Sequence, residues 1–385
     1  MTVGPAMAAV RERIRRLGPI PFDQYLELAL YSPDGGFYSS VGEAGRGGDF
    51  LTSPELGTLF GAVLARAIDS WWEELGAPDP FVIVESAAGV GTLAKAVLAS
   101  QPACAPALRY LLVERSPRLR ERQPSVLAVE PASTVLGPMG RADDEDDDGA
   151  PVLPGGGPRV ASLGELPVGP FTGVVIANEL LDNLPFTLLE RTASGWCEVR
   201  VGESEGDPDV LVEVLTPAEA ADVEVAERLV PEAPVGGRIP LQSAAVEWLR
   251  TALRTMHRGR VVLVDYASST PELATRPVDE WFRTYRGGQR GGAPLDRPGS
   301  QDLTAEVCID QLARVQTPAL DRLQSDFLAA HGIGDLVAEA RAAWEASAAR
   351  PDLAALGARS RVDEAAALLD PTGLGAFRVL EWTVG

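Results

Sequence analysis

Apolar and polar positions follow two different periods along this chain of 385 residues. Short, largely apolar runs at 81–85, 109–114, 173–177 and 260–265 predict buried strands, and helical patterns follow the first two. Apolar strands that alternate with helices are typical of a parallel sheet covered on both faces. The sequence therefore predicts an α/β protein with a doubly wound, Rossmann-like sheet.

Other periodic segments flank this core. Helical spacing of apolar residues predicts further helices at 7–17, 22–30, 55–75, 335–348 and 353–369. Residues 37–54 are rich in Gly, Ser and Thr and predict a loop. Alternation over 187–215 predicts antiparallel strands, and 377–382 predicts a last strand.

These elements predict two domains and two insertions. An N-terminal helical lobe with a glycine-rich loop covers 1–80, and a Rossmann-like domain covers 81–385. An insertion of strands and helices lies at about 187–258. Residues 137–158, which hold the acidic run Asp143–Asp148, predict a disordered surface insert, or alternatively an acidic clamp for a basic partner.

The charge of the chain narrows the class of partner. Asp and Glu number 55 against 34 Lys and Arg, so the formal net charge is −21. Such a chain is repelled by phosphate backbones, which argues against nucleic acid as the main partner. A basic protein substrate is the expected partner, a homodimer is a possible assembly, and solubility alone is the alternative explanation of the charge.

Cysteine and histidine usage and hydropathy lead to an expected location. Cys104, Cys197 and Cys308 are scattered, which fits a reducing compartment. Only His257 and His331 are present, far apart, so no metal site of the usual His/Cys type is expected. No apolar run is long enough to span a bilayer, and no apolar signal core follows the N-terminal arginines. We therefore expect a cytoplasmic protein.

The first strand of the core runs into a glycine turn and then a helix. Glu85 ends the strand, Ala87, Gly89 and Gly91 lie in the turn, and the helical pattern begins at Thr92. Such a turn lets a ligand approach the backbone and presents free helix N–H groups to it. These residues are predicted to bind a nucleotide-like cofactor.

Two cofactors fit this turn. The spacing from Gly89 matches the dinucleotide pattern, and Glu114 ends the next strand about twenty residues further on. S-adenosylmethionine (SAM) fits too, because its sulfonium and ammonium groups favour the acidic Glu85, which would repel a pyrophosphate. Glu114 suits the ribose of either cofactor. The residues favour SAM. The two alternatives are that the turn binds NAD or that it binds no cofactor and serves only close packing of the helix on the sheet.

An acidic turn follows the strand at 173–177. Asn178, Glu179 and Asp182 would lie at the carboxyl edge of the sheet, beside the glycine turn. A guanidinium group would match these carboxylates, with Glu179 orienting it, Asn178 facing the transferred methyl group and Asp182 supporting both. The three are predicted catalytic residues. The alternative is that Asp182 or Asn183 only caps a helix or turn.

Ordered motifs along most of the chain resemble the MidA family of SAM-dependent methyltransferases, which includes a mitochondrial arginine methyltransferase of complex I assembly. The motifs are, in chain order, Pro21-Phe22 with Tyr25–Pro33 and Gly36–Tyr38; Gly48–Glu55; Glu85 with Gly89–Leu93; Val113–Pro117; Asn178, Glu179, Asp182 and Leu184-Pro185; Val264–Tyr266; Tyr285–Gly287; and Asp302–Ala305.

The resemblance implies a class I methyltransferase fold with an N-terminal helical lobe, SAM as cofactor and methyl transfer to a protein nitrogen, an arginine guanidinium. By position it places Asp49, Thr52 and Ser53 near the cofactor or substrate, and it makes Tyr266 and Arg286 candidate substrate contacts. From the residues alone, the loop before position 55 suits a lid, or a capped turn before the next helix.

The chain departs from the family pattern at three places. Ser86–Ala88 replaces L-G-P in the usual E-L-G-P-G turn, and Ala87 is expected to need an ordinary backbone conformation. Gly288 and Glu306 stand where the family tends to have histidines, so two proton acceptors or substrate contacts are missing. A small-molecule methyltransferase and a non-catalytic SAM-binding or assembly protein are therefore the alternatives.

Overall fold

The computed structural model describes residues 4–40, 53–137, 154–207, 210–348, 350 and 352–385. The chain divides into two compact units. Unit 1 comprises Met1–Phe50, Leu180–Arg250 and Tyr266–Thr317, and unit 2 comprises Leu51–Glu179, Thr251–Asp265 and Pro318–Gly385. Each unit is therefore assembled from three separate stretches of chain.

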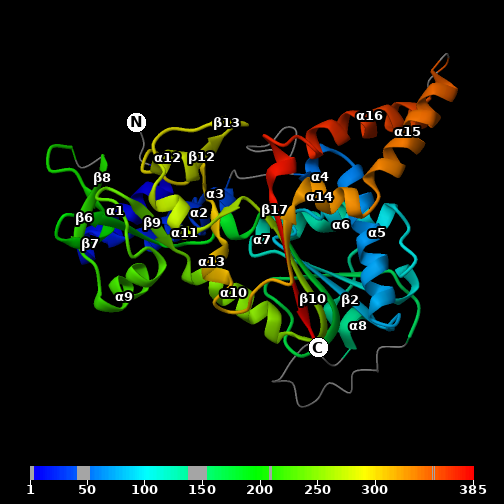
Figure 1. The fold of residues 1–385 in the computed structure, drawn as a ribbon, viewed down its shortest axis with the longest axis horizontal. Helices are drawn as coiled ribbons and strands as arrows, with labels where there is room; N and C mark the ends of the chain where they lie inside the picture. The colour runs from blue at the N-terminus through cyan, green and yellow to red at the C-terminus, as the bar shows by residue number, and fades with distance from the viewer. Residues whose placement is uncertain (1–3, 41–52, 138–153, 208–209, 349, 351) are drawn as a thin grey trace. The chain divides into compact units, whose positions relative to one another are not determined.

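Unit 2 is built on a seven-stranded sheet in the order β16-β17-β10-β5-β2-β3-β4. The strands are β2 (Phe81–Ser86), β3 (Leu108–Val113), β4 (Arg159–Leu163), β5 (Phe171–Asn178), β10 (Met256–Asp265), β16 (Leu320–Leu323) and β17 (Arg378–Val384). Strands β4, β3, β2, β5 and β10 pair in parallel, and β17 is antiparallel to both β10 and β16. Figure 1 shows β17, in red, beside β10. The four core strands and the last strand predicted from the sequence are confirmed.

The helices of unit 2 flank this sheet. They are α4 (Ser53–Leu56), α5 (Leu59–Glu74), α6 (Thr92–Ala99), α7 (Pro117–Arg122), α8 (Ala132–Leu136), α14 (Gln324–Ala330), α15 (Ile333–Ser347) and α16 (Leu353–Leu368). The two C-terminal helices predicted from the sequence are confirmed as α15 and α16, labelled in Figure 1. Strand β4 was not predicted, since only its centre is fully buried and its apolar signal is weak.

The single helix predicted over 55–75 is two helices, α4 and α5. A Cβ atom at Gly57 would lie 2.1 Å from Glu364 Oε1, so the chain opens here to admit the Glu364 side chain of α16. That carboxylate accepts a hydrogen bond from Leu59 N at 2.9 Å, in the first turn of α5. A tertiary contact therefore sets a helix start that the apolar spacing does not reveal.

Unit 1 combines N-terminal helices with a five-stranded antiparallel sheet. The helices are α1 (Pro5–Leu17), α2 (Phe22–Tyr31) and α3 (Phe37–Ser40), and the strands are β1 (Ile20–Pro21), β6 (Thr187–Thr192), β7 (Gly195–Glu203), β8 (Leu211–Pro217) and β9 (Arg238–Leu241). The antiparallel strands predicted over 187–215 are confirmed. The predicted loop at 37–54 is helical at Phe37–Ser40 and at Ser53-Pro54, and its residues 41–52 lie outside the described part of the chain.

The remaining short elements of unit 1 come from 220–312. They are α9 (Ala220–Leu229), α10 (Ser243–Arg254, which leads on into unit 2), β11 (Ala267–Ser268), α11 (Thr270–Ala274), α12 (Val278–Trp281), β12 (Phe282–Arg286), β13 (Gln289–Arg290), β14 (Asp302–Ala305), β15 (Val307–Cys308) and α13 (Ile309–Leu312). Strand β12 lies between β13 and β14 in a small antiparallel sheet.

The core of unit 1 explains why the units differ from the predicted domains 1–80 and 81–385. Phe22 of α2 packs against Phe186 and Phe282, with ring centroids 5.7 and 5.6 Å apart. Strand β1 pairs with β7 of the predicted insertion. The N-terminal helices also share one apolar core with Leu188, Val199 and Val201 of the insertion, so the two segments form one unit.

Two further expectations bear on the fold. Of the predicted acidic insert at 137–158, residues 138–153, which include the acidic run, lie outside the described residues. Among the helices that the structure describes, none combines the length and apolar character needed to cross a membrane.

Candidate functional site

The parallel strands of unit 2 bring the candidate residues to one edge of the sheet. Ser86, the last residue of β2, pairs with Val113 of β3 and with Ala177 of β5. Asn178, which ends β5, pairs with Val264 of β10. Because the carboxyl ends of parallel strands share an edge, the segments that follow these strands gather there, as is usual for ligand sites in open α/β sheets.

The glycine turn leaves room beside its backbone. Gly89 has a φ of +54°, and a Cβ atom placed on it would meet nothing within 4 Å. Gly91 has a φ of +92° and is the residue before α6, whose first residue is Thr92. Left-handed glycines at a helix start let a ligand approach the backbone and the first N–H groups of the helix.

Ala87 corrects one expectation about this turn. Its φ is +58°, in the left-handed region, and its side chain is exposed. The expected ordinary backbone conformation is therefore wrong. Ala87 therefore carries local strain, because a left-handed conformation costs about 1–2 kcal/mol for a residue with a Cβ atom.

Glu114 connects the second strand to the glycine turn. Its carboxylate accepts hydrogen bonds from Gly89 N at 2.9 Å and from Ser116 N at 2.7 Å. Burial raises the pKa of Glu114 above its usual value, although these two hydrogen bonds and the charge of Arg120 oppose the shift. A carboxylate offers about four lone-pair positions, so capacity remains for ribose hydroxyls beside the turn.

Glu85 is in a different state from the one expected. Only 4% of the residue is exposed, and its Oε2 accepts a hydrogen bond from Tyr110 Oη at 2.7 Å. Burial raises the pKa of Glu85 to about 8, against the opposing effect of hydrogen bonds from Tyr110 and the Ala94 backbone. Without a ligand this carboxyl is therefore mostly protonated at neutral pH, which differs from the charged Glu85 expected from the sequence.

Asn178 and Glu179 end β5 in a strained conformation. Glu179 has a φ of +50°, and its N–H donates to Val264 O at 2.9 Å. Asn178 Nδ2 donates to Glu179 Oε1 at 3.2 Å, while Asn178 Oδ1 is buried without a hydrogen-bond partner among the described residues. A non-glycine residue held at positive φ is typical of a functional position, because the fold must maintain it against strain.

Asp182 belongs to unit 1, in the 3₁₀ turn Leu181–Asn183. Asp182 is 4% exposed. Burial and then the charge of Asp302 raise the pKa of Tyr38 well above its usual value, and the charge of Asp182 adds a smaller contribution. Tyr38 Oη donates to Asp302 Oδ1 at 2.9 Å, and Asn183 Nδ2 donates to the same atom at 3.1 Å. Three of the motifs that carry the family resemblance thus meet in one buried network.

The glycine-rich segment before α5 is described only in part. Asp49 and Thr52 lie outside the described residues. Ser53 is fully buried, and its Oγ donates to Gln324 Oε1 of α14 at 3.1 Å. In this structure Ser53 joins α4 to α14, and its part in the cofactor site stays a prediction.

The two candidate substrate residues lie in unit 1. The backbone oxygen of Tyr266 accepts a hydrogen bond from Val307 N at 2.8 Å, and the Arg283 guanidinium lies 5.7 Å from the centre of the Tyr266 ring. Arg286 is exposed at the end of β12, before the turn formed by Gly287 and Gly288. Their contact with substrate stays a prediction.

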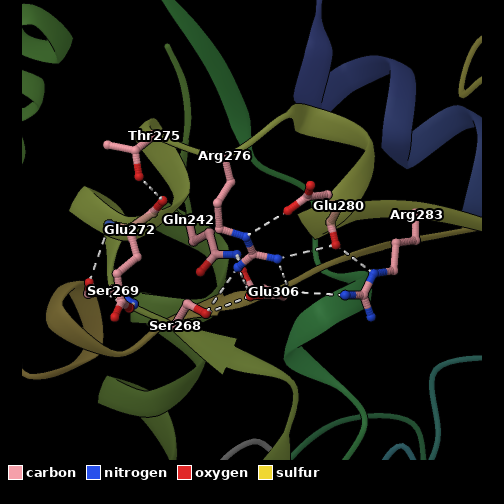
Figure 2. Close-up of polar contacts among 9 residues, drawn as sticks. All are labelled: Gln242, Ser268, Ser269, Glu272, Thr275, Arg276, Glu280, Arg283 and Glu306. Atoms are coloured by element: carbon pink, nitrogen blue, oxygen red, sulfur yellow. Dashed lines mark hydrogen bonds and ion pairs between the residues drawn. The ribbon is translucent and has the colours of Figure 1, made fainter. Parts of the chain in front are cut away.

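Glu306, which replaces a family histidine, is the centre of an ion-pair cluster (Figure 2). It pairs with Arg276 through two hydrogen bonds, of 2.8 and 2.9 Å, and with Arg283 at 3.2 Å, while Ser268 Oγ donates to it at 2.6 Å. Burial raises the pKa of Glu306, but these hydrogen bonds and charges outweigh it, so the pKa lies below the usual value. The carboxylate is therefore a structural anion and a poor proton acceptor.

Two residues that contact the site were not predicted from the sequence. Tyr110 hydrogen-bonds Glu85, and Gln123 Nε2 donates to Gly89 O at 2.8 Å. Gln123 lies four residues after Leu119 and four before Leu127, so a polar residue within an apolar helical stripe was the available signal. As for metals, the described residues include no group of three or more His, Cys, Asp or Glu side chains that could hold an ion.

Residues 63–325 match the model of a protein family described as S-adenosyl-L-methionine-dependent methyltransferase. The chain belongs to this family. The resemblance to MidA methyltransferases is confirmed, and the chain is a SAM-dependent methyltransferase.

Curated relatives agree with this assignment over most of the chain. Protein arginine methyltransferase NDUFAF7, mitochondrial, of Xenopus tropicalis is 28% identical over 340 residues, which cover 83% of this chain and 74% of the relative. The protein of the same name from Mus musculus is 29% identical over 81% of this chain and 70% of the relative.

These names correct the expected location. The relatives are named as mitochondrial proteins, which contradicts the cytoplasmic location expected from the sequence. Unpaired cysteines indicate only a reducing environment, and that property does not separate one such compartment from another.

A solved structure supports the fold and the cofactor. The crystal structure of a protein from Burkholderia thailandensis, described as a methyl transferase and bound to S-adenosyl-homocysteine, matches with a TM-score of 0.79 and 27% identity. The match covers 98% of this chain and 91% of that one. A second structure from the same organism matches with a TM-score of 0.77 and 28% identity. The class I methyltransferase fold and SAM as the cofactor are thereby confirmed.

The residues present fit SAM. Open space lies beside Gly89, and Glu114 retains capacity for ribose hydroxyls. The buried Oδ1 of Asn178, which no described residue satisfies, is an acceptor suited to an ammonium or polarised methyl group at the sheet edge. When bound, SAM supplies the electrophilic methyl group.

Proposed function

We propose that this methyltransferase modifies an arginine guanidinium of a protein, and that Glu179 is its principal catalytic residue. The observation that carries this proposal is the backbone of Glu179, a non-glycine residue fixed at a φ of +50° where β5 ends. The names of the curated relatives, which are protein arginine methyltransferases, support the choice of acceptor.

The chemistry follows from the charge and geometry of Glu179. Its carboxylate accepts hydrogen bonds from the guanidinium and localises positive charge on the nitrogens that do not react. A lone pair on the reacting nitrogen then forms the N–C bond as the C–S bond breaks, and the electrons of that bond leave on sulfur. The nitrogen afterwards releases a proton, which Glu179 accepts or passes to water.

Asn178 and Asp182 have supporting roles in this proposal. Asn178 Nδ2 donates to Glu179 Oε1 at 3.2 Å and so orients the carboxylate, and its buried Oδ1 would accept from the cationic part of the cofactor. Asp182, three positions further along the chain, contributes a second negative charge for the substrate. Tyr266 and Arg286 are proposed substrate contacts.

The cofactor is proposed to lie against the turn from Ala87 to Thr92, with Glu114 on the ribose. Gly89 gives the close backbone approach, Gly91 leads the chain into α6, and the first N–H groups of α6 would be available to the ligand. Glu85 takes part as a neutral group that braces the start of the turn through Tyr110. Asp49, Thr52 and Ser53 are proposed to complete the site.

The test is to incubate the purified full-length chain with isotopically methyl-labelled SAM and an extract in which other methyltransferases are inactivated. Mass spectrometry of peptides and of small solutes then locates the label. We expect the label on arginine side chains of protein. Label in a small solute would instead support a small-molecule methyltransferase.

A matched pair of variants distinguishes labelling by this chain from labelling by a contaminating methyltransferase. The Glu179→Gln variant should leave the arginine peptides unlabelled, whereas Glu73→Gln, at an exposed position of α5, should label them like the parent. SAM binding by the parent together with no label anywhere would support the non-catalytic alternative.

A further inference from the structure

Gln123 is a buried glutamine that contacts the cofactor turn and belongs to no recognised motif. It begins the 3₁₀ turn Gln123–Ser125, directly after α7, and none of its surface is exposed. Its Nε2 donates a hydrogen bond to Gly89 O at 2.8 Å. A side chain from the segment that follows β3 therefore reaches the backbone of the turn that follows β2.

Side chains hold both peptide groups that flank the Gly89 Cα atom. Its N–H donates to Glu114 Oε2 at 2.9 Å, and its oxygen accepts from Gln123 Nε2 at 2.8 Å. Both hydrogen bonds act while Gly89 keeps a φ of +54° with open space where a Cβ atom would be. The two side chains therefore fix the peptide groups before and after Gly89 and leave the space beside its Cα atom open for the ligand.

The same segment supports the next glycine of the turn. Leu127 N donates to Gln123 O at 3.0 Å, so this hydrogen bond joins Gln123 to the residues that follow the 3₁₀ turn. A Cβ atom at Gly91 would be 3.3 Å from Leu127 Cδ1. Gln123 and Leu127 thus brace Gly89 and Gly91 from one side.

Packing alone does not explain why the buried residue at position 123 is a glutamine, because burying its side-chain amide is unfavourable. Gln123 Oε1 is buried and has no hydrogen-bond partner among the described residues. An unpaired buried oxygen is unfavourable, and a leucine would fill the same volume without it. The hydrogen bond from Nε2 to Gly89 is therefore the feature that a glutamine adds at this position.

We propose that Gln123 is a positioning residue for the cofactor, which acts by holding the peptide group between Gly89 and Val90 in its ligand-accepting orientation. The inference rests on the assignment of the glycine turn as the SAM site. Gln123 works through Gly89 and lowers the cost of ordering the turn when the cofactor binds.

The test measures binding of S-adenosylhomocysteine by isothermal titration over a range of pH, for the parent chain and two variants. Gln123→Leu cannot donate a hydrogen bond, and we expect it to weaken binding about tenfold at every pH, the effect of one lost hydrogen bond. Gln123→Glu cannot donate while ionised, but a protonated carboxyl can. Its affinity relative to the parent should therefore recover as the pH falls.

Expressing each affinity as a ratio to the parent removes the effect of groups common to all three chains. Glu114, whose pKa burial raises, faces the same turn, and Arg120 donates to the backbone oxygen of Glu114 at 2.6 Å. The Glu114 charge and burial disfavour a second carboxylate at position 123 and raise the pKa of the carboxyl that Gln123→Glu introduces, so the recovery should begin at a higher pH than for an exposed glutamate.

Gln311→Leu is the matched control. Gln311 is also buried, in unit 1, and its Nε2 donates to the backbone oxygen of Pro240 at 2.8 Å. Gln311 also donates to Thr270 Oγ1 at 3.0 Å and accepts from Gln242 N at 2.9 Å. Gln311→Leu should therefore lose more stability than Gln123→Leu and still keep the parent's affinity for S-adenosylhomocysteine.

The outcomes separate this inference from the site assignment beneath it. If the parent chain did not bind S-adenosylhomocysteine, the assignment of the glycine turn as the SAM site would be contradicted. Binding by the parent with unchanged affinity in Gln123→Leu would overturn the role of Gln123. A loss in Gln123→Glu that does not recover at low pH would also overturn it, because packing and not hydrogen bonding would then be responsible.

Discussion

Two non-glycine residues at the sheet edge hold backbone conformations that their side chains disfavour. Ala87 has a φ of +58° and Glu179 a φ of +50°. The glycine turn and the end of β5 are therefore fixed by the surrounding structure and not by local preference. The two positions allow different tests, because only Glu179 carries a reactive group.

For Glu179 we expect a separation of catalysis from cofactor binding. Glu179→Gln removes the charge that orients the guanidinium, and methyl transfer should fall by about 100-fold or more. Affinity for S-adenosylhomocysteine should stay within a few-fold, because the carboxylate acts on the acceptor. Single-turnover kinetics and isothermal titration measure the two quantities, and a collapse of cofactor binding would refute the assigned role.

For Ala87 we expect a gain in stability. Ala87→Gly relieves about 1–2 kcal/mol of left-handed strain in the folded chain. Against this gain, glycine raises the entropy of the unfolded chain, which costs about 0.4–1 kcal/mol of stability. The net increase in the free energy of unfolding is roughly 0.5–1 kcal/mol. Chemical denaturation gives this value. Ala77→Gly is the matched control, since Ala77 is exposed with a φ of +53° outside the turn, and a loss of stability in both variants would contradict the argument.

At the scale of elements, β2 and β3 share a buried polar pair between neighbouring strands. Tyr110 lies opposite Ile83 in the register, two residues from Glu85 on the same face, and its hydroxyl hydrogen-bonds the Glu85 carboxyl. Burial that raises the pKa of Glu85 to about 8 makes folding favour the protonated form. The pair therefore couples the stability of the sheet to pH.

The sign of this coupling gives a prediction. The pKa of Glu85 is about 4.5 in the unfolded chain and about 8 in the folded chain. Its contribution to the stability of the folded state is therefore complete below pH 4.5 and is lost as the pH rises towards 8. The free energy of unfolding should thus decrease by roughly 1 kcal/mol per pH unit over this window, relative to Glu85→Gln. Denaturant titrations at several pH values measure it. Glu345→Gln, at an exposed position of α15, should keep the slope of the parent.

At the scale of the whole molecule, the candidate residues are divided between the two units. The glycine turn, Glu114, Asn178 and Glu179 belong to unit 2, and Asp182 to unit 1. Unit 2 has the class I methyltransferase topology and the turn assigned to the cofactor. Binding of cofactor alone should therefore act first on unit 2.

We expect S-adenosylhomocysteine at 100 times its dissociation constant to stabilise the folded chain by about 2.7 kcal/mol. Hydrogen exchange should slow mainly at 86–93, 114–127 and 177–180, because those segments form or brace the proposed site. NAD at the same concentration is the control and should leave exchange unchanged. Protection by NAD and none by S-adenosylhomocysteine would contradict the cofactor assignment.

The sequence by itself determined the strands of the core, the glycine turn and the acidic turn after β5. These features depend on local chain chemistry: apolar runs make buried strands, and glycines permit turns. Their order along the chain was also enough to identify the methyltransferase family. The expected location was wrong because cysteine usage reports a reducing environment, not a compartment.

Tertiary structure decided what depends on neighbours distant in sequence. The Glu364 side chain divides one predicted helix into α4 and α5, burial beside Tyr110 neutralises Glu85, and two arginines convert Glu306 into a structural anion. The Gln123 contact with Gly89 spans 34 positions of the chain. Charge state and hydrogen-bond partners are set by burial and by which side chains meet, and neither follows from periodicity.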